Sequence, residues 1–174
     1  MSKHRDNEPA RRSIRRFEEL TPRQVMALAI DIERGNARRF RTFAEVFQGY
    51  DDQVTARFIE LADEEDSHER VLLQTFQQQF GDEVPAVAED DVDVVIEAFD
   101  LVDAEQQIFD AMEPIRVYEL ALRSEKMAHD FYDRAAAACG QPLLVEMYRQ
   151  LADMEDDHVA WFEDKIRSAK ETGG

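Results

Sequence analysis

The sequence predicts an all-α fold, a four-helix bundle made of two helical hairpins that are joined by a long crossover containing a short helix. Six glycines and five prolines in 174 residues leave room for few turns. Four long stretches repeat apolar residues at spacings of three and four, which indicates amphipathic helices. The two halves also match at an offset of about 90 positions, which is typical of two related hairpins. The length fits one domain.

Composition excludes several classes of partner. The chain has 39 acidic and 21 basic residues, a formal net charge of −18. Nucleic-acid phosphates and anionic membrane surfaces repel such a chain, so we expect neither as a partner. The single cysteine, Cys139, rules out an internal disulfide and a thiolate metal site. No apolar run reaches the roughly 20 residues of a membrane span, and no secretory signal is visible, so we expect a cytoplasmic protein.

Residues 1–20 form a polar, locally basic N-terminal arm in this interpretation. It is either a disordered tail or an arm that docks on the acidic body of its own or a neighbouring chain. We favour the tail, because Ile14 and Phe17 are the only sizeable apolar residues between Met1 and Leu20. The bundle then occupies residues 21–168, and residues 169–174 fray.

The first predicted hairpin has clear helix boundaries. Thr21 and Gln24 form a capping box around Pro22, which suits the first helical position, and the helix runs to Gln48. The second helix opens at residues 51–52 and reaches Phe80. The loop between these helices is short, so they run antiparallel.

The second hairpin follows a crossover over residues 82–113, with a short helix from Val92 to about Met112. Pro114 begins a long helix that ends near Cys139, and Pro142 begins the last one.

One motif occurs twice. Residues 61–68 read LADEEDSH and residues 151–158 read LADMEDDH, so both contain Glu-x-x-His after the same lead-in. Glu65 and His68 lie one turn apart on one helix face, as do Glu155 and His158. Each pair can therefore reach one metal ion.

The other two long helices each place one glutamate, Glu33 or Glu125, at mid-length on the apolar stripe. Four buried carboxylates without counter-charge would be prohibitive, whereas two divalent cations would balance them. We therefore predict a dinuclear site in which Glu65 and Glu155 bridge. Carboxylate and imidazole ligands suit iron or manganese, and zinc is a further option. The predicted ligands are Glu33, Glu65, His68, Glu125, Glu155 and His158. The opposing interpretation, a metal-free bundle, predicts that the glutamates point to solvent.

Three further residues have open roles. His129 follows Glu125 by four positions and is a seventh ligand, a partner that hydrogen-bonds a ligand, or a core histidine, which we favour. Tyr132 and Tyr118 either hydrogen-bond ligand carboxylates or simply pack.

The six ligands in this order resemble the ferritin-like superfamily, and most closely its rubrerythrin-like and bacterioferritin-like di-iron carboxylate proteins. The resemblance covers residues 21–168. It implies a ferritin-like bundle with two iron ions per chain that oxidises Fe(II) with O₂ or H₂O₂, as a ferroxidase or peroxide-consuming oxidoreductase. Ala128 stands where rubrerythrins carry a further glutamate, and the Cys-x-x-Cys of a rubredoxin domain is missing, so we expect an external electron donor.

Two alternatives share these ligands. One is a non-catalytic iron-binding protein for storage or sensing. The other is an oxygenase of organic substrates, which we disfavour because large residues near the ligands leave no obvious cavity. We expect a homo-oligomer, with a dimer favoured.

Overall fold

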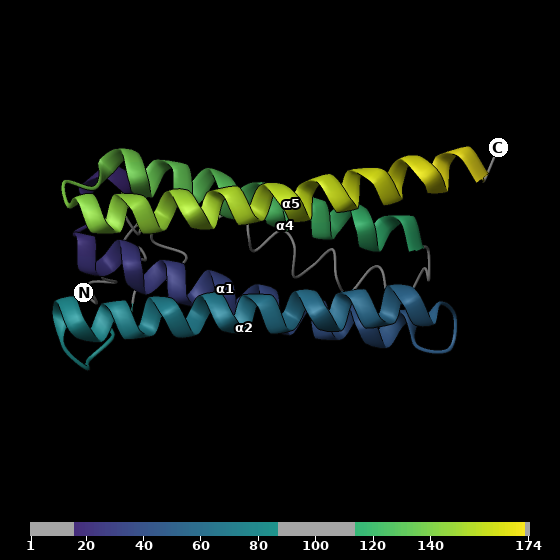
Figure 1. Ribbon diagram of the computed structural model, residues 1–174, viewed down its shortest axis with the longest axis horizontal. Coiled ribbons are helices and arrows are strands. Elements are labelled where there is room, and N and C mark those ends of the chain that lie inside the picture. Colours follow the sequence, from purple (N-terminus) through teal and green to yellow (C-terminus); the bar gives the residue numbers. More distant parts are fainter. Residues whose placement is uncertain (1–15, 87–113, 173–174) are drawn as a thin grey trace, which may run out of the picture.

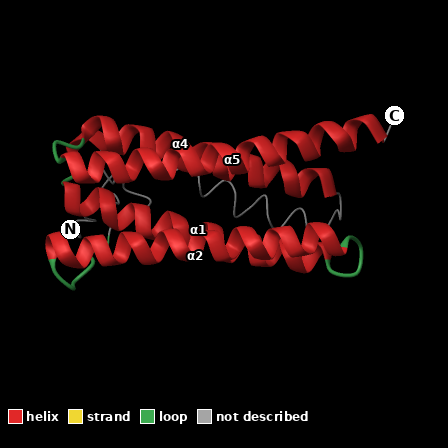
Figure 2. Cartoon of the chain, in the orientation of Figure 1, coloured by secondary structure: helices red, strands yellow, loops and turns green. Residues whose placement is uncertain are grey.

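The computed structural model describes residues 16–86 and 114–172. Within these residues the chain is helical, with no strand, and its four long helices lie along a common direction (Figures 1 and 2). The elements are the 3₁₀ helix η1 (Phe17–Glu19) and the helices α1 (Pro22–Phe47), α2 (Asp52–Phe80), α4 (Pro114–Ala138) and α5 (Pro142–Thr172). The predicted all-α bundle of two hairpins is confirmed. The predicted crossover helix and residues 1–15 lie outside the described residues.

The predicted capping residues begin both helices of the first hairpin. Thr21 Oγ1 accepts a hydrogen bond from the backbone N–H of Gln24 at 3.3 Å, and the Gln24 side chain accepts one from the backbone N–H of Thr21 at 3.0 Å. Asp51 caps α2 by accepting from two backbone N–H groups at 3.0 Å each. Between the helices, Gly49 has a φ of 77°, a conformation that favours glycine.

The last helix is longer than predicted. The expected fraying of residues 169–174 is wrong for residues 169–172, because α5 continues to Thr172. Ala169, Lys170 and Glu171 are strong helix formers. The positive charge of Lys170 also suits the negative end of the helix dipole.

The end of the N-terminal arm is docked, so the prediction of a free tail is wrong for residues 17–20. Phe17 is buried, and its ring meets Phe131 of α4 edge-on with centroids 5.5 Å apart. The Arg134 guanidinium lies 4.7 Å from the centre of the Phe17 ring and hydrogen-bonds Glu18 at 3.1 Å. One buried aromatic ring removes enough apolar surface from water to hold this short segment.

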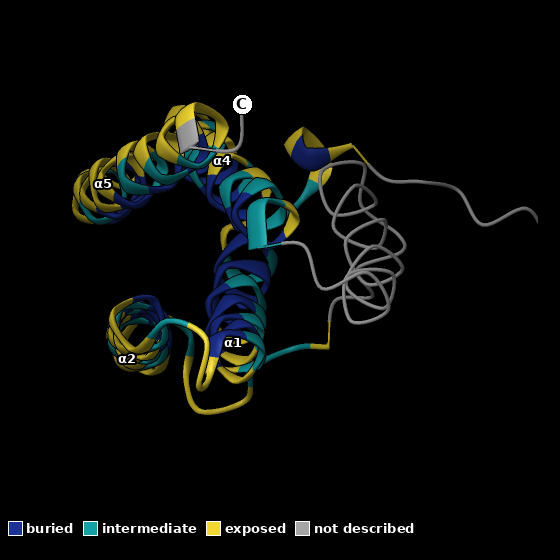
Figure 3. Ribbon diagram, turned by 90° about the vertical axis from the view of Figure 1, so that its right-hand side faces the viewer, coloured by how far each residue is buried: buried dark blue, intermediate teal, exposed yellow. Residues whose placement is uncertain are grey.

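The two hairpins meet along α1 and α4, as the end-on view shows, while α2 and α5 stand farther apart (Figure 3). Side chains span that space towards one end of the bundle, where the rings of Phe58 and Phe162 have centroids 5.8 Å apart. None of the described helices is long and apolar enough to cross a membrane.

A layer of buried polar side chains divides the core in two. One apolar cluster gathers around Phe17, Phe76, Phe131 and Tyr148. The other is largely aromatic and contains Phe40, Phe43, Phe47, Phe58, Tyr118 and Phe162. Between them lie the buried polar residues Glu33, Asn36, Glu65, His68, Ser124, Glu125, Glu155 and His158. The predicted site is therefore enclosed by apolar packing at both ends.

Candidate metal centre

All six predicted ligands are in this buried layer. The four glutamates are 0% exposed, and His68 and His158 are 8% and 2% exposed. One glutamate comes from α1, one from α4, and a Glu-x-x-His pair comes from each of α2 and α5. The metal-free interpretation required solvent-facing carboxylates, and the structure contradicts it.

The ligand atoms form two overlapping groups. Glu33, His68, Glu65 and Glu155 form one, in which the atoms lie within 4.8 Å of one another. The second group consists of Glu65, Glu125, Glu155 and His158, and its ligand atoms also lie within 4.8 Å of one another. The groups share Glu65 and Glu155, the two residues predicted to bridge. Two metal positions with two common carboxylates fit this arrangement.

The shared carboxylates also lack hydrogen bonds. Both side-chain oxygens of Glu65 and of Glu155 are buried, and none has a hydrogen-bond partner among the described residues. Buried polar atoms are normally paired, and buried charges are paired or coordinate metals. Carboxylate oxygens with two imidazole nitrogens are a donor set that suits iron or manganese. The residues present therefore fit a pair of divalent cations.

Both histidines turn the same ring nitrogen towards the acids. His158 Nδ1 lies 2.7 Å from Glu125 Oε2 and 3.4 Å from Glu155 Oε2. His68 Nδ1 lies 3.2 Å from Glu33 Oε2 and 3.6 Å from Glu65 Oε2. Nδ1 is therefore the atom that each ring would offer to a metal, and Nε2 points away from the four clustered glutamates.

Without a metal, the cluster retains protons. Burial and the charge of Glu65 raise the pKa of Glu33 to about 8. Burial and the charge of Glu155 raise the pKa of Glu125 well above its ordinary value. Burial alone would lower the pKa of His68, but Glu33 and Glu65 outweigh it and raise that pKa to about 10. Cation binding would displace these protons, because a ligating carboxylate or imidazole must be deprotonated.

Each terminal glutamate is held by a different donor. The Tyr132 hydroxyl donates to Glu33 Oε1, as one of the two predicted options required. The Asn36 amide donates to Glu125 Oε1 at 3.5 Å, and Ser124 Oγ donates to Asn36 Oδ1 at 2.7 Å. This amide and hydroxyl were not predicted from the sequence, although Asn36 follows Glu33 by one helical turn and Ser124 directly precedes Glu125.

Arg39 supports the same contact from outside the stripe. Its Nη1 donates to Asn36 Oδ1 at 2.8 Å and to Ser124 Oγ at 2.9 Å. The long side chain reaches this layer from a position that sequence spacing places beside the core rather than in it.

The two other open residues lie elsewhere. Tyr118 packs in the aromatic cluster, with its ring 5.4 Å from that of Phe47. His129 is partly exposed, with Nδ1 3.4 Å from Asp130 and Nε2 3.5 Å from Asp156. Neither belongs to the two ligand groups found among the described residues. His129 lies on the same side of α4 as Glu125, but its ring turns towards Asp130 and Asp156 at the surface.

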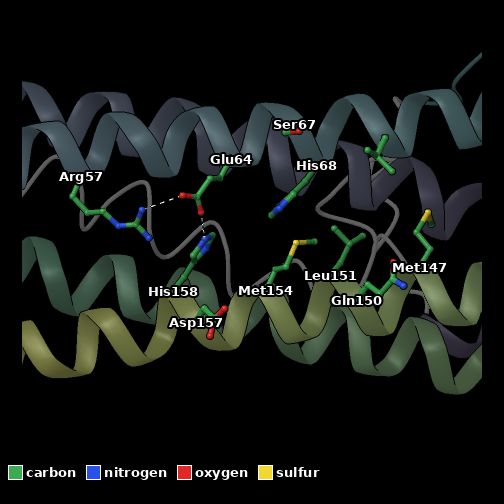
Figure 4. Close-up of a pocket in the computed structure, with 11 residues that line it drawn as sticks. Arg57, Glu64, Ser67, His68, Met147, Gln150, Leu151, Met154, Asp157 and His158 are labelled. Carbon is green, nitrogen blue, oxygen red and sulfur yellow. Dashed lines mark hydrogen bonds and ion pairs between the residues drawn. The ribbon is translucent and has the colours of Figure 1, made fainter.

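A groove reaches the histidines from outside. It lies between α2 and α5, has a volume of about 610 Å³, and is lined by His68, His158 and the apolar Val71, Leu151 and Met154 (Figure 4). The expectation of no cavity beside the ligands was therefore wrong. The separation of α2 and α5 creates this space, and it cannot be seen in the spacing of residues along one helix.

The groove also holds an unpredicted contact. Glu64 Oε2 lies 2.8 Å from His158 Nε2, and Arg57 Nη1 donates to Glu64 Oε1 at 3.0 Å (Figure 4). Burial would raise the pKa of Glu64, but the hydrogen bond from His158 and the charge of Arg57 outweigh it and lower that pKa. Glu64 therefore stays ionised behind the ring.

Comparison with known families agrees with this site. The rubrerythrin family model matches residues 24–166. The chain belongs to the rubrerythrin family. A solved structure titled Hypothetical Protein Pfu-1136390-001, from Pyrococcus furiosus, superposes with a TM-score of 0.68 at 20% identity, over 87% of this chain and 91% of that one. At this identity the likeness shows a shared fold. Comparison with curated proteins gives no match.

Proposed function

We propose that this rubrerythrin-family chain is a di-iron protein that oxidises Fe(II) with O₂ or H₂O₂. The observation that carries the proposal is the pair of buried ligand groups sharing Glu65 and Glu155, whose carboxylate oxygens have no hydrogen-bond partner in the described structure. Membership of the rubrerythrin family supports it. Iron is the proposed native metal, and manganese or zinc would fit the same donors.

The ligands divide into two sets in this proposal. Glu33 and His68 would hold one iron, and a second set, Glu125 with His158, would hold the other. Glu65 and Glu155 would bridge them. When bound, two Fe(II) ions supply two electrons, which with two protons reduce one H₂O₂ to two waters.

The chain itself orients the ligands and admits the reactants. Tyr132 and Asn36 keep one oxygen of Glu33 and of Glu125 occupied, which leaves the other oxygen to face the cluster. The groove gives O₂, H₂O₂ and incoming Fe(II) a route to the two histidines. The two apolar clusters exclude water from both ends of the layer.

An anaerobic Fe(II) titration tests the proposal directly. Two irons per chain, followed by a near-ultraviolet oxo-bridged ferric band on oxidation, would support it, and the faster oxidant would identify the substrate. Glu65→Ala and Glu155→Ala remove a bridge and should abolish dinuclear binding. If either variant still holds two irons, or if the wild type shows no saturable binding near two per chain, the assignment is wrong.

Repeated turnover separates the enzyme from its closest alternative. A storage or sensing protein would bind iron through the same residues without sustained H₂O₂ consumption. We propose a cytoplasmic homodimer supplied by an external electron donor. Light scattering would measure the oligomer, and H₂O₂ consumption with an added reductant would measure turnover.

The groove favours a second candidate, oxygenation of a small apolar molecule. Val71, Leu151 and Met154 give the groove an apolar lining beside both histidines. In such a reaction O₂, two electrons from two Fe(II) and two protons would convert a C–H bond to C–OH and release one water. Toluene added to the reduced protein before O₂ tests it. Hydroxylated toluene would favour this candidate, and unchanged toluene with full Fe(II) oxidation would favour the first.

A further inference from the structure

The two halves of the site differ in what lies behind each histidine. His158 Nε2 is 2.8 Å from the Glu64 carboxylate, which is itself held by Arg57 at 3.0 Å (Figure 4). No hydrogen bond or ion pair joins His68 Nε2 to any described residue, and this ring borders the groove. Nε2 of His158 therefore has an ionic partner, whereas Nε2 of His68 has none among the described residues.

The internal repeat shows which residue replaces that partner. At the offset of 90 that relates His68 to His158, Glu64 corresponds to Met154. Met154 is 38% exposed and lines the groove from α5, across from His68 of α2 (Figure 4). A thioether sulfur is only a weak acceptor, so it cannot take the role of a carboxylate.

A carboxylate behind a ligating histidine has a known physical effect. It accepts the proton of the distal ring nitrogen, orients the ring, and makes the other nitrogen a stronger donor to metal. Arg57 keeps Glu64 in place, and its guanidinium also lies 5.9 Å from the centre of the Trp161 ring. The carboxylate that contacts His158 is thus held in place by side chains outside the cluster.

The terminal glutamates differ in the same direction. The Tyr132 hydroxyl donates to Glu33, and a hydrogen bond to a carboxylate stabilises its charge and makes it a weaker base. The corresponding donor to Glu125 is the Asn36 amide at the longer distance of 3.5 Å. Glu125 and His158 are therefore the more basic pair.

We propose that Glu64 is a positioning residue that makes the metal position at Glu125 and His158 tighter than the one at Glu33 and His68, so that the two positions fill in order. This inference rests on the proposed function. The position at Glu33 and His68 fills last and exchanges first.

The test uses metal binding by the full chain after treatment with a chelator. Co(II) titration followed by visible absorption gives the two dissociation constants. Substoichiometric Zn(II) added to protein with ¹⁵N-labelled histidine shows which ring binds first. The chain has only four histidines, so His158→Ala and His68→Ala assign the ring signals. We expect two steps, with the His158 signals changing in the first.

Glu64→Met gives the position behind His158 the same residue type, methionine, that stands at the corresponding position 154. It should weaken the tighter step by roughly 10–100-fold and leave the weaker one unchanged. Glu60→Gln is the matched control, because Glu60 also pairs with Arg57, at 3.3 Å, and is not among the partners of His158. It should change neither step. Met154→Glu should tighten the weaker step, and it keeps the test decisive if Glu64→Met does not fold.

Four results would overturn the inference: equal affinities in the wild type, first binding at His68, an unchanged tight step in Glu64→Met, or an unchanged weak step in Met154→Glu. Each of these leaves two bound ions per chain, so the proposed function would survive. A chain that binds no Co(II) or Zn(II) would overturn both.

Discussion

The shared carboxylates should destabilise the chain when no metal is bound, and Glu155→Gln measures this effect. Glu155 is fully buried, its oxygens have no hydrogen-bond partner in the described structure, and its carboxylate lies among three other acids and two histidines. An unpaired buried polar group costs about 1–3 kcal/mol, and a charged one costs more. The glutamine amide keeps the size, removes one acid, and can donate to a neighbouring carboxylate. We therefore expect the metal-free variant to be more stable than the metal-free wild type by about 1–3 kcal/mol.

With saturating metal, the wild type should instead be more stable than Glu155→Gln. Binding to the folded state alone stabilises a protein by about 2.7 kcal/mol at a ligand concentration 100 times Kd. The wild type gains this stability, whereas the variant has lost a bridging ligand. Urea unfolding with chelator and with excess Co(II) measures both states. Asp153→Asn, an exposed charge removal on the same helix, is the control and should change neither.

A metal-free Glu155→Gln protein less stable than the metal-free wild type would refute this reasoning, provided that the control behaves as expected. It would mean that the carboxylate is satisfied by attraction to His158 Nδ1, 3.4 Å away, rather than waiting for a cation.

Three further outcomes are expected. Tyr132→Phe should weaken metal binding by roughly 10–100-fold, because the loss of the donor that orients Glu33 outweighs the gain in basicity of its carboxylate; Tyr118→Phe, whose ring packs in the aromatic cluster, is the control and should not affect the Co(II) titration. The metal-free protein should lose stability as pH rises, since the folded pKa values of Glu33 (about 8) and His68 (about 10) lie above the ordinary 4.5 and 6.5. That contribution is complete below the ordinary values and disappears as pH passes the folded ones, so urea midpoints with chelator should fall between about pH 5 and pH 10. A flat profile would contradict it. His129→Ala should still bind two metals, and a drop to one would make His129 a ligand.

The sequence predicts the helices and the six clustered residues well because both follow from periodicity within single helices. Glu65 and His68 interrupt an apolar stripe, and their counterparts recur 90 positions later. The spacing therefore places them in the core, and the charge balance explains why they are there. The capping residues set the ends of α1 and α2 in the same local way.

Features that depend on two helices at once were missed. Glu64 sits one position before a ligand and would pass for an ordinary surface acid, because nothing in α2 alone shows that its carboxylate reaches His158 of α5. The groove likewise depends on the distance between these two helices. Phe17 was visible as an isolated apolar residue, but its partner Phe131 lies more than a hundred positions away. For His129 the helical spacing misled in the opposite direction. It suggested a place near Glu125, whereas the ring lies beside Asp130 and Asp156.

Because α2 and α5 stand apart, metal ions in the buried polar layer would also connect the two hairpins. Among the described residues, the backbones of the two hairpins approach each other mainly along α1 and α4, and each ligand group has members from both hairpins. Two cations at this layer would cross-link the two hairpins. The number of bound metal ions would then limit how far the two hairpins can separate. It would also couple their unfolding, so that one hairpin would not unfold without the other. Bound metal ions would then also hold the two hairpins together and set the width of the groove between α2 and α5.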